Sequence, residues 1–305
     1  MASVFSGNAE FLQAQIQARY AAMLQEKLRE SRVRPLIDVL QTGTGKVRLP
    51  IFFADGQLKE WTDQLSVSNI EDFFQDVETK RYAEGYRVKK DWLEKSREEF
   101  GPMVQQFVNN ELDLMGSFED RKIAELLTLN PTIWDGTAFF ANARPNLKSA
   151  AALDNILSGT GITKAQIYAD LASAMDVLEG FQKPSGEPFF PYVEFTAMIP
   201  SRLRADMEAI KTSEFIVQNE TNALRGKFDY IVNPFLTGND WYLVNSAPAF
   251  KFALKLEASY PEGQPSWNMI DEEQTKTTRT MLYYNSMEAA VALVNPLVIV
   301  KIDNV

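Results

Sequence analysis

Two stretches of the chain place apolar residues at helical spacing, and both predict long amphipathic helices. The first covers residues 8–31 and is followed by Pro35; its apolar positions are Leu12, Ile16, Tyr20, Met23, Leu24 and Leu28. Lys and Arg do not dominate its polar face, as they do in helices that lie on membranes, so the apolar stripe indicates a packing face. The second covers residues 102–128 and starts with Pro102, which suits the first turn of a helix about 40 Å long. Gly116-Ser117 would either bend this helix or cap a second one.

Residues 58–90 alternate partly between polar and apolar positions and carry many charges. Trp61 lies near the start, "IEDFFQDVETKRY" follows, and Gly85 precedes a second alternating stretch. The pattern predicts a β-hairpin with its turn at Gly85. A two-stranded ribbon without its own core is marginally stable, so it must lie on something. Two interpretations stay open: a hairpin folded over its own domain, and a hairpin that reaches onto a neighbouring subunit.

The remaining segments predict a mixture of helices and strands. Helical patterns cover residues 147–157, 163–179 and 201–212, and Thr163 is a natural N-cap for the second of them. Strand patterns cover residues 188–200, 227–236 and 240–246, and residues 275–302 alternate enough for two or three further strands. The fold class that follows is α+β.

The segment "DGTAFFANARPN", residues 135–146, combines turn residues with two adjacent aromatic residues. Asp135-Gly136 permits a bend with positive φ. Burial of Phe139 and Phe140 would contribute roughly 1.5–3 kcal/mol per ring. The pattern predicts a loop anchored by its phenylalanines, which would serve either a catalytic lid or a structural subunit.

The composition removes most catalytic chemistry. The 305 residues include no cysteine and no histidine, which excludes thiolate nucleophiles, serine–histidine triads and histidine-based metal sites. Adjacent carboxylates occur at Glu98-Glu99, Glu119-Asp120 and Asp271-Glu272-Glu273, each among Lys or polar residues as on a solvated surface. No cofactor or metal is therefore expected. A hydrolase that uses carboxylates alone stays open, because a carboxylate pair across a cleft cannot be recognised from sequence.

Binding of nucleotides, of nucleic acid over a broad surface, and of membranes is not expected. "TGTGK", residues 42–46, lacks a glycine at Leu40 and Ser or Thr at Val47, so it predicts a flexible turn and no phosphate loop. The net charge of −10 opposes tight binding of polyphosphates. The chain contains neither an apolar run of about 18 residues nor a secretory signal pattern at its first residues.

The order of these segments resembles the Mu-like phage major head protein family, roughly from Leu58 to the end of the chain. The family's Asp-Gly-x-x-Phe-Phe element matches Asp135, Gly136, Phe139 and Phe140. Its hydrophobic-Pro element matches residues 198–200, and its Asp-Trp-Tyr-Leu element matches Asp240, Trp241, Tyr242 and Leu243. The chain departs from the family at residues 143–145, Ala-Arg-Pro, where the family loop continues with a histidine.

The resemblance implies the Hong Kong 97-type capsid fold, with an N-terminal arm (1–57), an extended β-hairpin loop (58–90), a peripheral domain with a long spine helix (91–160), an axial domain (161–274) and returning C-terminal strands (275–305). The phenylalanine pair would pin the crossing between spine helix and axial domain. The expected structural or interface residues are Trp61, Phe73, Phe74, Tyr82, Tyr86, Asp135, Gly136, Phe139, Phe140 and Trp241.

The implied function is that of a major capsid protein of a tailed double-stranded DNA bacteriophage, without catalytic activity. It would self-assemble into hexamers and pentamers of an icosahedral shell in the virion, after synthesis in the host cytoplasm. The implied partners are scaffolding, portal and decoration proteins; the DNA would be enclosed without sequence-specific binding. The alternatives are the carboxylate-based hydrolase and another phage structural subunit, of the neck or tail.

Overall fold

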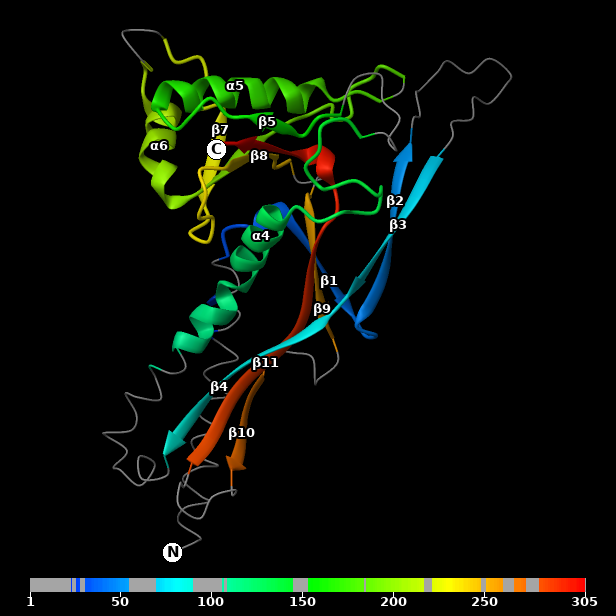
Figure 1. The fold of residues 1–305 in the computed structure, drawn as a ribbon, viewed down its shortest axis with the longest axis vertical. Helices are drawn as coiled ribbons and strands as arrows, with labels where there is room; N and C mark the ends of the chain where they lie inside the picture. Colours follow the sequence, from blue (N-terminus) through cyan, green and yellow to red (C-terminus); the bar gives the residue numbers. More distant parts are fainter. Residues whose placement is uncertain are drawn as a thin grey trace, which may run out of the picture.

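The structure is a computed structural model that describes residues 23, 26–27, 31–54, 70–89, 106, 109–144, 153–183, 185–216, 221–247, 251–259, 266–272 and 280–304. Of these, residues 52–54, 70–72, 86–89, 266–272, 280–283 and 285 are described by their backbone alone. The described part is elongated, with two helices and one sheet gathered at one end and long strands running away from them (Figure 1).

The first sheet lies at the end that holds the two helices. Its strand order is β5 (Ile156–Ser158), β12 (Ile299–Asp303), β8 (Trp241–Asn245), β6 (Phe195–Ile199) and β7 (Phe228–Val232). The pairs β5–β12 and β6–β7 are parallel, and β8 pairs antiparallel with both of its neighbours. The helices are α5 (Lys164–Gly180) and α6 (Arg204–Thr212), which follows the short helix η2 (Ser201–Leu203).

The second sheet is built around one long strand. β11 (Thr280–Leu293) pairs antiparallel with β4 (Lys80–Lys89), β10 (Ser266–Glu272) and β9 (Ala253–Ala258), and β9 in turn pairs in parallel with β1 (Ile37–Thr42). The predicted C-terminal strands are thus confirmed, and they are shared between the two sheets. Only η3 (Pro296–Val298) and two residues separate β11 from β12 of the first sheet.

The predicted hairpin within residues 58–90 is wrong in its pairing. β3 (Ile70–Glu78) pairs with β2 (Lys46–Ala54) and forms a two-stranded ribbon with it, whereas β4 pairs with β11. Gly85 lies inside β4 opposite Tyr284 and makes no turn. The ribbon, β2 and β3, projects from the body beside the second sheet (Figure 1). Residues 42–46 form the turn between β1 and β2, as predicted, and Gly45 there has a φ of 70°.

The described part of the predicted helix 102–128, residue 106 and residues 109–128, is helical except for a turn at Ser117. Residues 109–116 continue into α4 (Phe118–Leu129), since Ser117 donates its N–H to Asp113 and accepts the N–H of Arg121 at 3.0 Å each. Ser117 therefore does not cap a second helix. The helix ends at Asn130, which adopts a left-handed conformation with a φ of 50°.

Local signals predicted most of the other elements. α5 starts with a capping box in which Thr163 and Gln166 satisfy each other's backbone N–H groups. The strand patterns at 188–200, 227–236 and 240–246 correspond to β6, β7 and β8, and the helical pattern at 201–212 to η2 and α6. The predicted helix 147–157 is wrong where the structure describes it, because Ile156–Ser158 is a strand paired with β12. The predicted helix 8–31 lies almost wholly outside the described residues.

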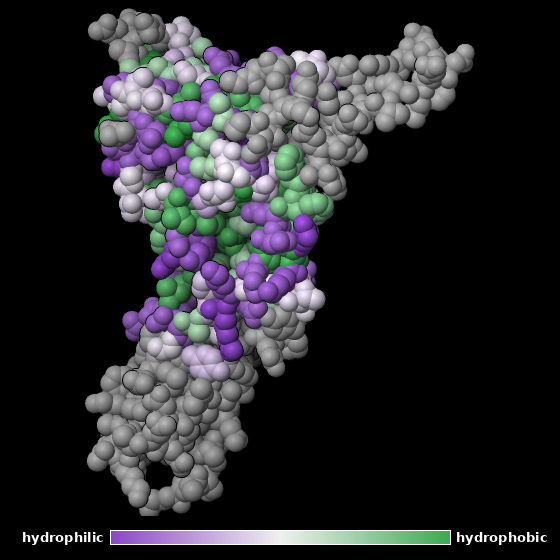
Figure 2. All heavy atoms as spheres, turned by 45° about the vertical axis from the view of Figure 1, so that its right-hand side comes forward, coloured by the Kyte–Doolittle hydropathy of each residue, from purple (hydrophilic) through white to green (hydrophobic). Residues whose placement is uncertain are grey.

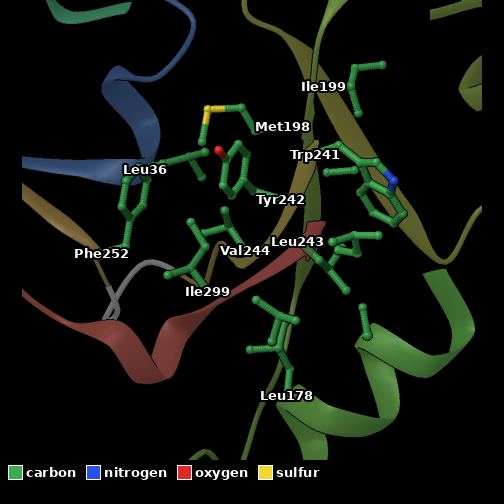
Figure 3. Packing of buried hydrophobic residues seen from close by; sticks show 14 of the residues in the cluster. Leu36, Leu178, Met198, Ile199, Trp241, Tyr242, Leu243, Val244, Phe252 and Ile299 are labelled. Atoms are coloured by element: carbon green, nitrogen blue, oxygen red, sulfur yellow. The ribbon is translucent and has the colours of Figure 1, made fainter. Parts of the chain in front are cut away.

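Both faces of β8, the central strand of the first sheet, are buried. Trp241, Tyr242, Leu243 and Val244 of β8 are all at most 2% exposed. Figure 3 shows alternate side chains of this strand on opposite faces, with Tyr242 and Val244 directed toward Leu36 and Phe252, and Leu243 toward Leu178 of α5. Residues from distant parts of the sequence thus pack together in one hydrophobic core. Among the described residues, no helix has the length and apolar character needed to cross a membrane.

Candidate functional site

The crossing loop, residues 130–144, leads from α4 toward the first sheet and begins with the predicted turn. Asp135 accepts the backbone N–H of Thr137 at 3.0 Å, and Gly136 has a φ of 75° and donates to the carbonyl of Ile133 at 2.9 Å. Because this φ lies in the region that favours glycine, the Asp-Gly pair sets the course of the loop.

The phenylalanine pair of the crossing loop is buried. Phe139 and Phe140 are 0% and 3% exposed, and their rings meet edge to face with centroids 5.0 Å apart. Phe140 also packs on Tyr242 of β8 at 5.4 Å. The side chain of Asn130 accepts the N–H of Phe140 at 2.7 Å and donates to its carbonyl at 3.0 Å. The rings therefore connect the end of α4 to the first sheet.

A buried ion pair holds the crossing loop from within. Arg144 Nη1 lies 2.6 Å from Asp135 Oδ2, and both side chains are 0% exposed. Arg144 Nη2 donates to the carbonyl of Ala138 at 2.9 Å and to that of Phe139. Burial lowers the pKa of Arg144, and the Asp135 carboxylate opposes that effect. Arg144 is one of the three residues, 143–145, at which the chain departs from the pattern of the family that it resembles. No sequence pattern predicted its ion pair with Asp135.

Replacing Arg144 by lysine tests the geometry of this ion pair. Lysine keeps the positive charge but lacks the planar fork that reaches the carboxylate and two carbonyls together. We expect Arg144→Lys to lower the free energy of unfolding by about 1–3 kcal/mol, because buried acceptors lose their donors. Arg202→Lys, at an exposed arginine that bonds one carbonyl, is the control and should leave stability unchanged. Equal effects in both variants, measured by urea unfolding, would contradict the role of Arg144.

Two further side chains tie the crossing loop to both sheets. Asn155, 0% exposed, donates to the carbonyls of Phe139 at 2.9 Å and of Pro296 at 3.0 Å, and accepts the N–H of Ala141 at 2.9 Å. Trp134 Nε1 donates to the carbonyl of Val294 at 2.7 Å. The loop thereby fixes the connection between β11 and β12, where the chain passes from one sheet to the other.

A charged junction joins α4 to the second sheet; it comprises Arg34, Glu119, Asp120, Lys255 and Glu257. Glu119 Oε1 lies 2.7 Å from Arg34 Nη1 and 2.9 Å from Lys255 Nζ, and Lys255 also contacts Glu257 at 2.7 Å. Glu119 and Lys255 are 0% and 2% exposed. The assignment of Glu119-Asp120 to a solvated surface is therefore wrong, because both side chains are buried and Glu119 pairs with cations that are distant in sequence.

Asp120 holds the chain ahead of η1 (Arg34–Leu36). Its carboxylate accepts the N–H of Val33 at 3.1 Å and the hydroxyl of Ser31 at 3.3 Å, and its own carbonyl accepts Asn233 Nδ2 at 2.8 Å. Burial raises the pKa of Asp120, while the hydrogen bonds to residues 31–33 act in the opposite direction. The residue therefore joins three segments at some cost in desolvation.

The raised pKa predicts a pH dependence. A carboxyl group whose pKa is higher in the folded state stabilises the fold at low pH, and this contribution is lost as the pH rises through the raised pKa. Asparagine keeps an oxygen acceptor for Val33 without the charge. We expect the melting temperature of Asp120→Asn to improve relative to the unchanged protein as the pH rises from about 4 to about 7. Asp76→Asn, whose side chain is 82% exposed, should show no such trend. A constant difference across the range for Asp120→Asn would exclude this effect.

The ribbon packs against its own subunit along one face. Val77, 6% exposed, contacts Leu256 and Ala290 of the second sheet, and Phe73 lies 4.7 Å from the ring of Trp134. Gln75 Nε2 donates to the carbonyl of Leu293 at 3.2 Å. At Phe73, Gln75 and Val77 the segment therefore lies over its own subunit, as the first of the two interpretations predicted.

The opposite face of the ribbon is exposed and charged. Lys46 pairs with Glu78 at 2.8 Å and Arg48 with Asp76 at 3.8 Å, all with exposed side chains. Phe74 is 46% exposed, with the Arg48 guanidinium 4.5 Å from its ring centroid. This face carries the charge that the sequence indicated.

The other expected site residues are scattered. Tyr82 of β4 is half-buried against Phe118 at 4.9 Å, and Lys122 lies 5.3 Å from its ring. Tyr86 lies opposite Tyr283 in the pairing of β4 with β11, and Trp61 lies outside the described residues. Within the part of the chain that the structure describes, no three Asp or Glu residues come together as a metal ion would require. The chain thus brings Asp135, Gly136, Phe139 and Phe140 together in the crossing loop, and Phe73 contacts that loop through Trp134. Trp241 is buried on the face of β8 opposite Tyr242, on which Phe140 packs.

No protein-family model and no curated protein matches the chain. Solved structures do match it over nearly its full length. The capsid of cyanophage P-SCSP1u gives a TM-score of 0.57 at 10% identity, covering 90% of this chain and 88% of that chain. A virus-like particle from Pyrococcus furiosus gives 0.56 at 12% identity, covering 95% and 99%, and the capsid of cyanophage Pam1 gives 0.56 at 12%, covering 90% and 92%. The chain has the Hong Kong 97 capsid fold.

The match to this capsid fold confirms the predicted fold class. The features that hold the fold in this chain were visible in the sequence to different degrees. The turn at Asp135-Gly136 and the apolar run of β8 carry local signals. The ion pair of Arg144, the clamp of Asn155 and the charged junction carry none, since each depends on partners that only the folded chain brings close.

Proposed function

We propose that the chain is a major capsid protein of a tailed double-stranded DNA bacteriophage and self-assembles into the hexamers and pentamers of an icosahedral shell. The observation that carries the proposal is the mutual coverage with capsid structures, up to 95% of this chain and 99% of the other. This coverage supports the proposal because it extends over nearly the whole chain and is not limited to one sheet. Membership of the Mu-like family rests on the sequence elements around Asp135, Pro200 and Trp241.

The strand pairings suggest how the parts are divided. We assign the first sheet with α5 and α6 to the axial domain, and the second sheet with residues 109–129 to the peripheral domain and its spine helix. In this assignment the ribbon of β2 and β3 takes the place of the extended loop expected at 58–90. The expected boundaries at 161–274 and 275–305 cut across these sheets, because β9 and β10 pair with β11 while β12 pairs with β8.

Subunit contacts on several sides would use exposed apolar residues. Hydrophobic residues lie between hydrophilic ones on the face that Figure 2 shows. Among the described residues, large apolar side chains with more than a third of their surface exposed lie in β1, in the ribbon, in the spine helix and in loops; they are Leu40, Phe74, Leu114, Leu129, Ile162, Tyr192 and Phe215.

The same proposal implies the partner proteins, the location of the subunit and its relation to the DNA. Scaffolding, portal and decoration proteins would be the partners, and the subunit would move from the host cytoplasm into the virion. The net charge of −10 makes the average contact with enclosed DNA neutral or repulsive, so the genome would be confined without being bound in sequence-specific fashion.

Light scattering of the purified protein separates this proposal from the hydrolase and from a neck or tail subunit. A capsid protein should form hexamers, pentamers or closed particles as its concentration increases. A hydrolase should remain a small oligomer and turn over esters, glycosides or nucleotides above background. Turnover that is abolished by changing one Asp or Glu would refute the proposal, and rings of one fixed size would favour the neck or tail.

A further inference from the structure

Three exposed arginine side chains meet at the short segment that follows β7, residues 232–237. Arg32 Nη1 donates to the carbonyl of residue 232 at 2.9 Å, and Arg202 Nη2 donates to that of residue 237 at 3.3 Å. The guanidinium of Arg121, in α4, lies 4.9 Å from the ring centroid of Phe235. Figure 1 shows the yellow loop after β7 beside α4 and the blue chain ahead of β1. Arg32, Arg121 and Arg202 form what we call the arginine patch.

The segment under the arginine patch is held in place by Asn233, which is 0% exposed. Asn233 Nδ2 donates to the carbonyl of Asp120 at 2.8 Å, and Asn233 Oδ1 accepts the N–H of Phe235 at 3.0 Å. The N–H of Asn233 donates to the carbonyl of Ile199 at 2.9 Å, and its carbonyl accepts the N–H of Leu236 at 3.2 Å. The groups that position the arginines are therefore fixed to α4 and to β6.

Within the part of the chain that the structure describes, no carboxylate forms an ion pair with the arginine patch. Two neighbouring carboxylates serve other groups: Glu208 accepts the hydroxyl of Tyr230 at 2.5 Å, and Asp229 pairs with Lys211 at 2.5 Å. The described arginines that do form ion pairs are Arg34, Arg48 and Arg144. Each guanidinium of the patch has five N–H donors and gives at most one to a backbone carbonyl, so most of its donors can reach a ligand.

The arginine patch can recognise a partner by charge and hydrogen bonding, and offers little apolar area. Leu236 is 7% exposed and Phe235 is partly buried beneath Arg121. The buried centre of a protein–protein interface is rich in apolar and aromatic side chains, which this surface does not present. Guanidinium groups match phosphate oxygens with two parallel hydrogen bonds.

We propose that the arginine patch binds the phosphate backbone of double-stranded DNA. The proposal rests on the proposed function, under which the shell encloses DNA. Phosphates carry no sequence information, so the contact is independent of sequence. The chain as a whole has a net charge of −10 and repels DNA, so the patch would confine the contact to one place on each subunit. A contact of three arginines is weak in one subunit and is repeated in every copy of the shell.

Removing charge from the patch tests the proposal. Fluorescence anisotropy with a DNA duplex of mixed sequence measures binding to the purified subunit, below the concentration at which it assembles. Arg121→Gln with Arg202→Gln should weaken binding about tenfold or more at about 50 mM salt, and should reduce the slope of log K against log salt by about 1.8, because two phosphate contacts are lost. Circular dichroism should be unchanged, since both side chains are exposed.

Lys46→Gln with Arg48→Gln is the matched control. It removes the same net charge, but from side chains that are paired with Glu78 and Asp76 in their own subunit, so it should change the affinity much less. Arg121→Lys with Arg202→Lys keeps the charge and should retain most of the affinity. Equal affinity of the glutamine variant and this control, or no binding of DNA by the unchanged protein, would overturn the proposal.

An acidic polypeptide is the other partner that a basic surface could accept. Poly-glutamate of the same total charge should compete with the duplex at least about tenfold less well, because duplex DNA carries one charge per about 1.7 Å of its axis. Equal competition would overturn the assignment to the phosphate backbone.

Electron microscopy keeps this proposal apart from the proposed function. The glutamine variant should form the same closed particles as the unchanged protein. Loss of particles with unchanged affinity for DNA would assign the patch to a contact between copies and overturn the proposal. If the unchanged protein forms no particles but binds DNA through the patch, the proposed function fails and the arginine patch stands.

Discussion

Phe139→Ala is expected to lower the free energy of unfolding by about 3–5 kcal/mol. Phe139 is 0% exposed and meets Phe140 edge to face, so alanine would leave a cavity between the crossing loop and the first sheet. The loop backbone is fixed by Asn130, Arg144 and Asn155, and cannot collapse freely into this space. Chemical unfolding followed by circular dichroism measures the loss, and poor soluble expression would be its first sign. Phe140→Ala should fall in the same range.

Phe215→Ala is the matched control for the phenylalanine pair. The same atoms are removed from a side chain that is 48% exposed, so its effect should stay within about 0.5 kcal/mol. If the Phe139 and Phe140 variants unfold at the same denaturant concentration as this control, the crossing loop is not anchored by its rings.

Shortening the ribbon is expected to abolish shells without unfolding the subunit. The variant replaces residues 52–72 with an Asn-Gly turn, which joins Ile51 directly to its partner Phe73. Phe73, Gln75 and Val77 keep their contacts with the body, so the remaining strands stay folded. Under the proposed function the removed part contacts a second copy, since a two-stranded ribbon is marginally stable without a surface to lie on. Circular dichroism and electron microscopy of the same sample measure both outcomes.

The control for the ribbon is a change at its exposed base. Lys46→Gln with Glu78→Gln removes an ion pair whose side chains are 69% and 63% exposed, worth about 0–1 kcal/mol, and should leave both folding and shells unchanged. Shells of normal size from the shortened ribbon would exclude a role in assembly. An unfolded chain would show that the removed part belongs to the core of its own subunit.

The sequence predicted elements whose signals are local. The capping box of Thr163 and Gln166 marks the start of α5, and the helical pattern of residues 102–128 ends within one residue of α4. The turn at Asp135-Gly136 and the burial of the following phenylalanines follow from residue chemistry within six positions. Such features need no knowledge of the rest of the chain.

Strand pairing could not be predicted, because it depends on segments far apart in sequence. β3 and β4 are separated only by Thr79, yet they pair with different partners, and β4 pairs with residues about 200 positions later. Adjacent alternating stretches with a glycine between them favour a hairpin in isolation. Here the long strand β11 offers β4 a ten-residue partner, so Gly85 is extended within the ladder and does not form a turn.

The burial of charged side chains could not be predicted for the same reason. Glu119 and Asp120 look like surface residues in the sequence, since Arg121 and Lys122 follow them. Lys255 and Arg34, the partners of Glu119, are 136 and 85 positions away, and Ser31 and Val33, the partners of Asp120, are 89 and 87 positions away. Burial of a carboxylate is tolerated when such partners are present, and no local pattern reveals them.

Electron microscopy of the concentrated, purified protein tests the central claim most directly. The account predicts closed icosahedral particles whose walls resolve into hexamers and pentamers, with the density of one subunit matching the two sheets, α5 and the spine helix. The shortened ribbon, imaged in parallel, should give folded subunits without closed walls. A protein that stays monomeric or forms a small oligomer of fixed size at every concentration, with the subunit fold intact, would contradict the claim that this chain builds a shell.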